Sequence, residues 1–285
     1  MMNEAHKAKA NMFLKMHEAD GCFLMPNAWD AGSAKMLVHS GFGAIGTTSA
    51  GVAFALGRPD NVYCSPEARV SRQAMLAEIQ SVTQSVSVPV NADLEGGYGD
   101  SPEDVADCIK LAIEAGAMGG NIEDYTGIEA APLYDLSLAV ERIRAAREAI
   151  DASGVPFVLV ARTDRLLAAA PDGFAEAVER ANRYREAGAD CLFAPGASDL
   201  PTVSSLVREI NGPINVVMGL SGSDVSVAQL RDVGVRRISI GGSLARALYF
   251  RIQEAAREML EEGTFAFAQN QVAQSELNKI FESTL

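Results

Sequence analysis

The sequence predicts an α/β fold of the (β/α)8 TIM-barrel class with extra C-terminal helices, and three observations lead to this prediction. The chain has 285 residues, enough for one large domain of this kind. Eight short apolar runs follow one another along it, and the segments between them carry helix signals. Such an alternation over about 250 residues is typical of a closed barrel, and a doubly wound open sheet is the alternative.

The first predicted strand is the run "CFLMPN" at residues 22–27. Seven more strands follow it, and they are entered alternately by a glycine turn and by a proline. A glycine in the left-handed conformation commonly ends a helix. Proline fits the first residue of a strand, where its missing donor costs least. The glycine entries are Gly41, Gly116, Gly188 and Gly234, and the proline entries open the runs at residues 88–93, 155–164 and 212–218.

Helix starts are marked between these strands. Ser65 and Pro66 are expected to open one helix as N-cap and first residue, and Ser101 and Pro102 another, with Asp104 completing a capping box. Residues 1–21 show an amphipathic helix pattern rather than a signal peptide, because they lack an apolar core and a cleavage site.

We expect one barrel domain over residues 1–285, with residues 250–285 as a C-terminal helical extension. The tail from residue 244 onward is helical in pattern and longer than the last barrel helix requires. The surplus is expected to pack on a neighbouring subunit in a dimer or tetramer, or alternatively to cap the barrel base.

The composition excludes several classes of partner. A net charge of −13 argues against binding to nucleic acid or to an anionic membrane surface. The sequence contains no run of 18 apolar residues, so we expect no membrane span. The cysteines (Cys22, Cys64, Cys108 and Cys191) are scattered, which suits free thiols and a cytoplasmic location. The three histidines all lie in the first 40 residues, so a histidine-ligated zinc site is not expected.

Charged and polar side chains collect where the predicted strands end, which is where barrels carry their chemistry. In the strand run "VNAD" and the following "LEGGYG", Asp93 and Glu95 are two residues apart and should face one side. A single arginine, Arg162, is embedded in a strand end. The remaining candidates are Asp60 after the second strand, Glu123 and Asp124 after the fourth, Asp164 after the fifth, and Asn215 on the seventh, which we take as substrate-binding.

Oxygen ligands without histidine suit a hard cation, Mg²⁺ or alternatively Mn²⁺. One acid alone would more simply cap the next helix, but acids recur on three strands in succession. Arg162 needs an anionic partner, which is either an acid at the rim or a substrate carboxylate or phosphoryl group. The turn "GTTSAG" at residues 46–51 either cradles a carboxylate or is simply a tight turn.

With these residues collected, the sequence resembles the phosphoenolpyruvate mutase/isocitrate lyase superfamily from about residue 23 to residue 248. The resemblance rests on "PNAWDAGSAKMLVHSGFGAIGTTSAG", "LGRPDN", "PVNADLEGGYG", "NIED" and "ARTD", in this order and spacing. It implies a metal site of Asp60, Asp93, Glu95 and Glu123, with Glu95 standing where the family usually has a second Asp. It also implies a substrate-binding arginine, Arg162, and a carboxylate-binding turn of Thr48, Ser49 and Ala50.

The sequence departs from the family in the segment that selects the reaction. Isocitrate and methylisocitrate lyases carry a K-[KR]-C-G-H motif after the fourth strand, and the mutases have a lysine there. Here the segment "EDYTGIEAAPLYDL" has no Cys, Lys or His. Tyr98, Tyr125 and Glu129 are the titratable groups left nearby. The candidate catalytic residues are therefore Arg162, Tyr98 and Glu95, with Tyr98 alternatively a packing aromatic.

The resemblance implies a Mg²⁺-dependent lyase that cleaves a C–C bond of a small 2-hydroxy or 2-oxo di- or tricarboxylate through an enolate. Isocitrate, methylisocitrate or dimethylmalate lyase-like and oxaloacetate hydrolase or decarboxylase-like reactions fall in this class. The alternatives are a phosphonomutase or phosphonopyruvate hydrolase, and a dicarboxylate sensor without catalysis. A further alternative is an aldolase or isomerase binding phosphate at Gly242 and Ser243, although no predicted strand carries the internal lysine that it would use.

Overall fold

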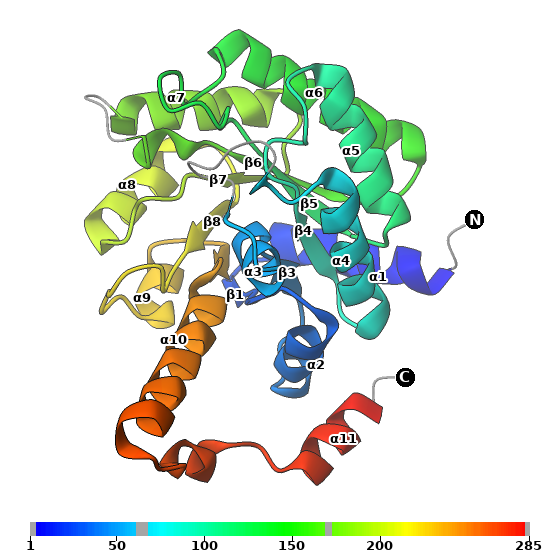
Figure 1. The fold of residues 1–285 in the computed structure, drawn as a ribbon. Coiled ribbons are helices and arrows are strands. Elements are labelled where there is room, and N and C mark those ends of the chain that lie inside the picture. Colours follow the sequence, from blue (N-terminus) through cyan, green and yellow to red (C-terminus); the bar gives the residue numbers. More distant parts are fainter. Residues whose placement is uncertain (1–3, 61–67, 169–172, 283–285) are drawn as a thin grey trace.

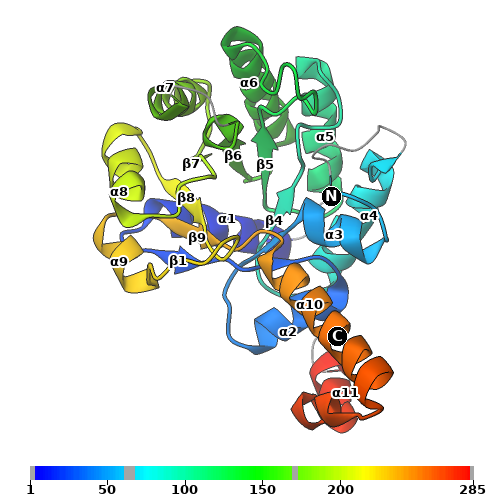
Figure 2. The same cartoon turned by 60° about the vertical axis from the view of Figure 1, so that its left-hand side comes forward.

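The strands form one parallel sheet that closes on itself. The structure is a computed structural model that describes residues 4–60, 68–168 and 173–282. The sheet order is β1-β9-β8-β7-β6-β5-β4-β3-β2. Because β1 and β2 are consecutive pieces of one segment, the two ends of this order meet and the sheet curls into a barrel (Figures 1 and 2). The strands are β1 (Phe23–Leu24), β2 (Asn27–Ala28), β3 (Ile45–Thr47), β4 (Val90–Asp93), β5 (Gly119–Glu123), β6 (Val158–Arg162), β7 (Cys191–Phe193), β8 (Ile214–Val217) and β9 (Arg237–Ser239).

The TIM-barrel prediction is confirmed, and the doubly wound alternative is excluded. The first predicted strand differs in detail, because the structure divides it into β1 and β2 at Met25 and Pro26. Proline has no N–H for the ladder. The segment uses this break to change partners: the Met25 N–H donates to Ile238 O, and the Gly46 N–H donates to Pro26 O.

Helices surround the barrel and begin and end largely where the sequence indicates. The four predicted helix-ending glycines have φ between 91° and 107°, and the capping box of Ser101 and Asp104 is present. One start differs: α4 begins at Arg72 with Ser71 as N-cap, and the predicted cap Ser65 and Pro66 lie outside the described residues, as does Cys64. The helices are α2 (Ala31–His39), α3 (Ser49–Ala55), α4 (Arg72–Ser85), α5 (Pro102–Glu114), α6 (Leu136–Ser153), α7 (Gly173–Glu186), α8 (Leu200–Glu209) and α9 (Val227–Asp232).

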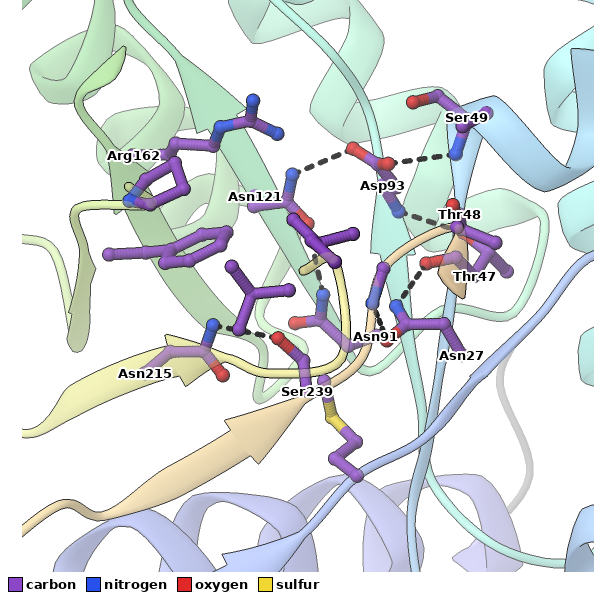
Figure 3. A pocket seen from close by; sticks show the side chains of 18 of the residues that line it. Asn27, Thr47, Thr48, Ser49, Asn91, Asp93, Asn121, Arg162, Asn215 and Ser239 are labelled. Atoms are coloured by element: carbon purple, nitrogen blue, oxygen red, sulfur yellow. Dashed lines mark hydrogen bonds between the residues drawn. The ribbon is translucent and has the colours of Figure 1, made fainter. Parts of the chain in front are cut away.

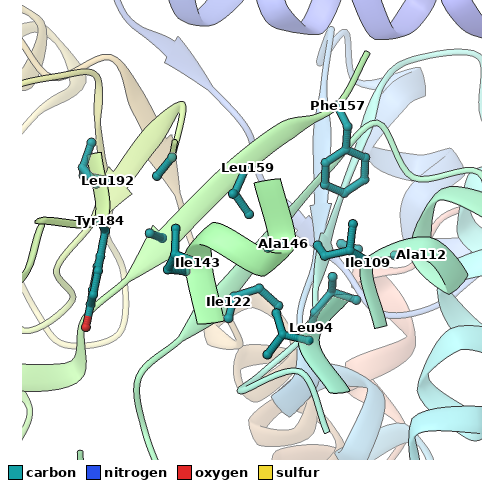
Figure 4. Close-up of a cluster of buried hydrophobic side chains, with 14 of the residues drawn as sticks. Leu94, Ile109, Ala112, Ile122, Ile143, Ala146, Phe157, Leu159, Tyr184 and Leu192 are labelled. Carbon is teal, nitrogen blue, oxygen red and sulfur yellow. The ribbon is translucent and has the colours of Figure 1, made fainter. Parts of the chain in front are cut away.

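The predicted N-terminal helix is α1 (Glu4–Glu18), and it closes the end of the barrel at which the strands begin. Ala10, Phe13 and His17 lie on one face of it and are buried. Phe13 packs with strand residues such as Val158 and Cys191 in the barrel interior. A second, larger apolar core fills the layer between strands and outer helices, where Leu94 and Ile122 meet Ile109 of α5 and Ile143 of α6 (Figure 4).

The C-terminal region leads away from the barrel. Helix α10 (Ser243–Arg257) runs outward without a break at residue 250, and a π turn (Glu258–Glu262) and a 3-10 turn (Ala266–Asn270) lead to α11 (Gln274–Glu282) (Figures 1 and 2). Helix α11 returns to α2, where Lys35 Nζ donates to Phe281 O at 2.9 Å. No helix in the described ranges is long and apolar enough to cross a membrane.

Candidate active site

A cavity of about 160 Å³ opens where the strands end at their C-terminal side. Seven of the predicted metal, substrate-binding and catalytic residues line it. Figure 3 labels five of them: Thr48, Ser49, Asp93, Arg162 and Asn215. Glu95, Tyr98 and Glu123 do not line the cavity. The lining side chains that carry the argument are Asn27, Thr47, Thr48, Ser49, Ala50, Asp60, Asn91, Asp93, Asn121, Arg162, Asn215, Arg237 and Ser239.

Asp93, the last residue of β4, is held rigidly in this cavity. Its Oδ2 accepts the backbone N–H of Ser49 at 2.8 Å, and its Oδ1 accepts Asn121 Nδ2 at 2.8 Å. Its own N–H donates to Thr47 Oγ1 at 2.8 Å. The turn "GTTSAG" therefore borders the cavity, and one of its N–H groups already binds Asp93.

A row of side-chain amides forms the cavity floor. Asn91 and Asn121 precede Asp93 and Glu123 by two residues on their strands, so they project to the same side as these acids. Asn91 Nδ2 donates to Asn121 Oδ1 at 3.2 Å, which links the row to Asp93. Asn215 Nδ2 donates to Ser239 Oγ at 3.0 Å. Sequence reasoning missed Asn27, Asn91 and Asn121, although "PN", "VNAD" and "GNIE" place each at or just before a strand end.

The prediction that Asp93 and Glu95 face one side of a strand is wrong. Strand β4 ends at Asp93, and Glu95 (φ 49°) and Tyr98 (φ 61°) adopt left-handed conformations in the turn that follows. The turn is pinned by the buried Arg142 of α6, which donates to the backbone oxygens of Gly96, Gly99 and Asp100. Glu95 consequently turns into a neighbouring pocket, where Tyr98 OH donates to Glu95 Oε1 at 3.0 Å.

This neighbouring pocket also holds the segment that departs from the family pattern. Tyr125, Thr126 and Tyr134 of that segment line it beside Glu95 and Tyr98. Burial, together with repulsion from Asp93, raises the pKa of Glu95 to about 7. Burial and the charge of Glu95 raise the pKa of Tyr98 well above its ordinary value, so the phenol keeps its proton.

Arg162 satisfies its charge within the protein. Its Nε and Nη2 bind Asp164 Oδ1 and Oδ2 at 2.5 and 2.8 Å, and its Nη1 lies 3.0 Å from Glu123 Oε2. Of the two partners left open for this arginine, an acid at the rim is the one that the structure contains. Burial raises the pKa of Glu123 well above its ordinary value; Arg162 opposes this shift, and Asp164 and Asp93 add to it.

Asp124 is a structural residue behind this pair. It accepts the backbone N–H of Asp164 at 2.9 Å and Tyr184 OH at 2.6 Å, and it lies 3.3 Å from Arg180 Nη1. It does not line the cavity.

A second arginine, at the start of a strand rather than at its end, also lines the cavity, and it was not singled out from the sequence. Arg237 of β9 is 2% exposed and lines the same cavity. It was missed because "VRRISIGG" reads as a charged strand entry. The alternation within that strand was the available signal, since Arg237 and Ser239 share one side and Ile238 faces the outer core. Arg58 lines a different pocket beside α10.

Comparison with known proteins places this arrangement in a family. The phosphoenolpyruvate phosphomutase family profile matches residues 13–260. The chain belongs to the phosphoenolpyruvate mutase family. It is 31% identical to 2-methylisocitrate lyase of Escherichia coli, over 82% of this chain and 79% of that protein. The predicted superfamily is thus confirmed, and its members are lyases and mutases.

Two solved structures of the superfamily superpose on the whole chain. A provisionally assigned lyase/mutase from Burkholderia cenocepacia J2315 is 43% identical, with a TM-score of 0.92 and coverage of 98% of this chain and 97% of that one. A 2,3-dimethylmalate lyase, described as a PEP mutase/isocitrate lyase superfamily member, is 26% identical with a TM-score of 0.83, covering 98% and 95%.

The family resemblance implies a divalent cation, and the donor chemistry of the site fits one. Within the described ranges, no three His, Cys, Asp or Glu side chains form a ready-made ligand group. Nevertheless Asp93 and Asp60 line one cavity, and the negative charges of Asp93 and Asp60 act on Glu95 and help to raise its pKa. Mg²⁺ usually keeps several waters and needs only one or two direct carboxylates. Asp93 and Asp60 fit such a role, with Glu95 and Glu123 further back.

Proposed function

We propose that this protein is a Mg²⁺-dependent lyase that cleaves a C–C bond in a small 2-hydroxy or 2-oxo di- or tricarboxylate. The observation that carries the proposal is that Asp93 and Asp60 line one cavity, while the charge of Asp93 also helps to raise the pKa of Glu95 and of Glu123 behind it. Like charges held this close are costly unless a cation lies between them or a proton is shared. Mn²⁺ would suit the same oxygen ligands.

The residues have distinct parts in this proposal. Asp93 would hold the cation directly, with Asp60, Glu95 and Glu123 supporting it. When bound, a divalent cation acts as a Lewis acid that stabilises negative charge on a substrate carbonyl oxygen. C–C cleavage beside such a carbonyl leaves the electron pair as an enolate. Arg162 also lines the cavity, where it would hold Glu123 and Asp164 in place beside the substrate. Thr48, Ser49 and Ala50 would border the substrate carboxylate, and Asn215 would line its far side.

Proton transfer is assigned to the neighbouring pocket. Tyr98 holds its proton and donates it in a hydrogen bond to Glu95. We propose this pair as the proton donor and acceptor of the reaction, in place of the lid cysteine of the isocitrate lyases. The pairing supports a role for Tyr98 beyond packing.

The alternatives are weaker on specific observations. The described strands contain no lysine, which an aldolase of the phosphate-binding kind would use. Gly241 and Gly242 at the start of α10 do border the cavity. An anionic group of a substrate could therefore bind at this helix start. A phosphonomutase would share the carboxylate site, and nothing in the lid segment favours phosphorus chemistry.

The test is calorimetric titration of oxalate, a flat mimic of enolpyruvate, with and without Mg²⁺. Binding that requires Mg²⁺ is expected, and malates, isocitrates, oxaloacetate and phosphonopyruvate would then be screened for products. Equal binding without Mg²⁺, or none in either condition, would contradict the metal proposal. Tight Mg²⁺-dependent binding with no turnover of any candidate would instead favour a sensor.

A further inference from the structure

Arg237 carries a buried charge without a carboxylate partner. Its Nε donates to Asn215 Oδ1 at 2.8 Å, and its Nη1 lies 3.3 Å from Asn91 Oδ1 and 3.4 Å from His17 Nε2. None of these three groups is charged: two are amides, and burial lowers the pKa of His17 to about 3, so that its imidazole is neutral. Among the described residues no carboxylate forms an ion pair with Arg237, and its Nη2 makes no hydrogen bond with any of them.

Three other arginines of the barrel have acceptors for their guanidinium groups. Arg142, which is also buried, donates to the backbone oxygens of Gly96, Gly99 and Asp100. Arg180 is bound by Asp124 and Glu176, and Arg162 by Asp164 and Glu123. A guanidinium stays charged under all ordinary conditions, and burying it without a counter-charge is expensive. The charge of Arg237 is therefore uncompensated in a place where it lines the cavity.

Two donors beside the cavity floor make no hydrogen bond with the described residues: the Nη2 group of Arg237 and the hydroxyl hydrogen of Ser239. The oxygens of the amides around this arginine already accept hydrogen bonds: Asn91 and Asn215 from Arg237, and Asn121 from Asn91. Ser239 Oγ accepts from Asn215 Nδ2, which leaves its O–H available to donate. A neutral polar ligand needs acceptors as well as donors, whereas an oxyanion needs donors and positive charge.

We propose that Arg237 and Ser239 form a second anion subsite on the cavity floor, which takes the carboxylate of the substrate farthest from the reacting carbons. The inference rests on the proposed function, because it assumes that the other end of the substrate lies at Asp93. It selects dicarboxylates over monocarboxylates as substrates. The selection depends on Arg237, because Arg162 is neutralised by two carboxylates of its own.

The experiment compares two ligands that differ at one end only. Malate and 2-hydroxybutyrate have the same four-carbon chain, with a carboxylate or a methyl group at the far end. Each is titrated calorimetrically against the full-length protein, with and without Mg²⁺, and oxalate is titrated as a probe of the Asp93 end alone. One charge-assisted contact predicts that malate binds about tenfold to a hundredfold more tightly than 2-hydroxybutyrate.

Arg237→Gln should abolish this preference while leaving the affinity for oxalate within about twofold. Arg236→Gln is the matched control: it removes the same charge from the neighbouring residue, which does not line this cavity and donates to Gly21 O. Ser239→Ala is a milder variant that serves if Arg237→Gln fails to fold, and it should lower malate affinity about threefold without changing oxalate.

An unchanged malate preference in either cavity variant would overturn the subsite, as would its absence in the unmodified protein. An equal loss of malate and oxalate would also overturn it, because Arg237 would then only position Asp93 through the amide row. Failure of the proposed function would be seen separately, as oxalate binding that is the same with and without Mg²⁺. The comparison of malate with 2-hydroxybutyrate would still test Arg237 in that case.

Discussion

At the scale of single residues, the charge that the cavity presents to a ligand depends on which charged side chains already have partners inside the protein. Asp93 accepts two N–H groups and still faces the cavity. Arg162 has two internal carboxylate partners, and Arg237 has none among the described residues. A site of this kind presents a negative end at Asp93 and a positive floor at Arg237. The polarity suits a ligand that brings a cation to one end and an anion to the other.

Asp93→Ala should weaken Mg²⁺-dependent oxalate binding at least about thirtyfold, the loss expected when one member of a buried charge contact is removed. Calorimetry with and without Mg²⁺ measures it. Asp107→Ala is the control, because Asp107 forms an exposed ion pair with Lys110 on α5. Binding by the Asp93 variant at the level of the unmodified protein would refute the metal assignment.

Arg162→Ala should lower the free energy of unfolding by about 3–5 kcal/mol at pH 7, because Glu123 and Asp164 are left buried without a cation. The loss should shrink at lower pH, since burial raises the pKa of Glu123 and its protonation removes one of the two buried negative charges. Urea unfolding at pH 7 and at pH 5 measures both effects. The Arg162→Ala variant should also bind oxalate more weakly, while Mg²⁺ still binds. Arg183→Ala breaks an exposed pair with Glu186 and should cost less than about 1 kcal/mol.

At the scale of elements, helix α1 and the turn after β4 position side chains at the candidate site. Helix α1 places His17 against Arg237 from the closed end of the barrel. The turn after β4 diverts Glu95 and Tyr98 out of the main cavity. Two non-glycine residues in left-handed conformations cost free energy, and the three hydrogen bonds from Arg142 to that turn help to hold them there.

His17 predicts a pH dependence of stability. The folded protein keeps His17 neutral down to about pH 3, whereas the unfolded chain takes up a proton below about 6.5. The unfolded state therefore binds more protons in this window, and stability falls as the pH falls, by at most about 1.4 kcal/mol per pH unit from this residue. His17→Gln should flatten the slope of urea-unfolding free energy between pH 6.5 and pH 4.5.

The exposed histidine His39, at the end of α2, provides the comparison: His39→Gln should leave that slope unchanged. An equal slope in the His17 variant and the unmodified protein would show that other groups cause the acid sensitivity.

At the scale of the whole molecule, the C-terminal helices leave apolar side chains in solvent. Ile252 is 61% exposed, Leu260 87% and Phe265 68%, on a segment that leads away from the barrel (Figure 2). Several large apolar side chains exposed along one segment indicate a surface that a protein partner could cover. We propose that a second copy of the chain covers it, in a dimer or tetramer.

Ile252→Glu combined with Leu260→Glu should shift the protein toward the monomer mass of 30.1 kDa in size-exclusion chromatography with light scattering. A charge placed in a buried interface loses its hydration without gaining a partner. Ile128→Glu changes an equally exposed residue in the segment after β5 and should leave the mass unaltered. A monomer mass for the unmodified protein would contradict the proposal.

The barrel could be predicted from the sequence because its signals are local. Glycines such as Gly116 end helices, prolines open strands, and apolar runs alternate with capped helices; each depends on neighbours in the chain. The positions of Asp93, Arg162 and Asn215 at one rim followed from the fold class, because parallel strands bring their ends together.

Only the tertiary structure decided which of these groups face the cavity and which are already paired. Glu95 lies two residues after Asp93, yet a turn pinned by Arg142 from a helix more than 40 residues later directs it elsewhere. Arg162 finds Glu123 on the neighbouring strand β5 and Asp164 two residues further along its own segment, while Arg237 meets amides from β4 and β8 and a histidine from α1. Apart from Asp164, these partners come from distant parts of the chain, so the charge balance appears only when the barrel closes around them.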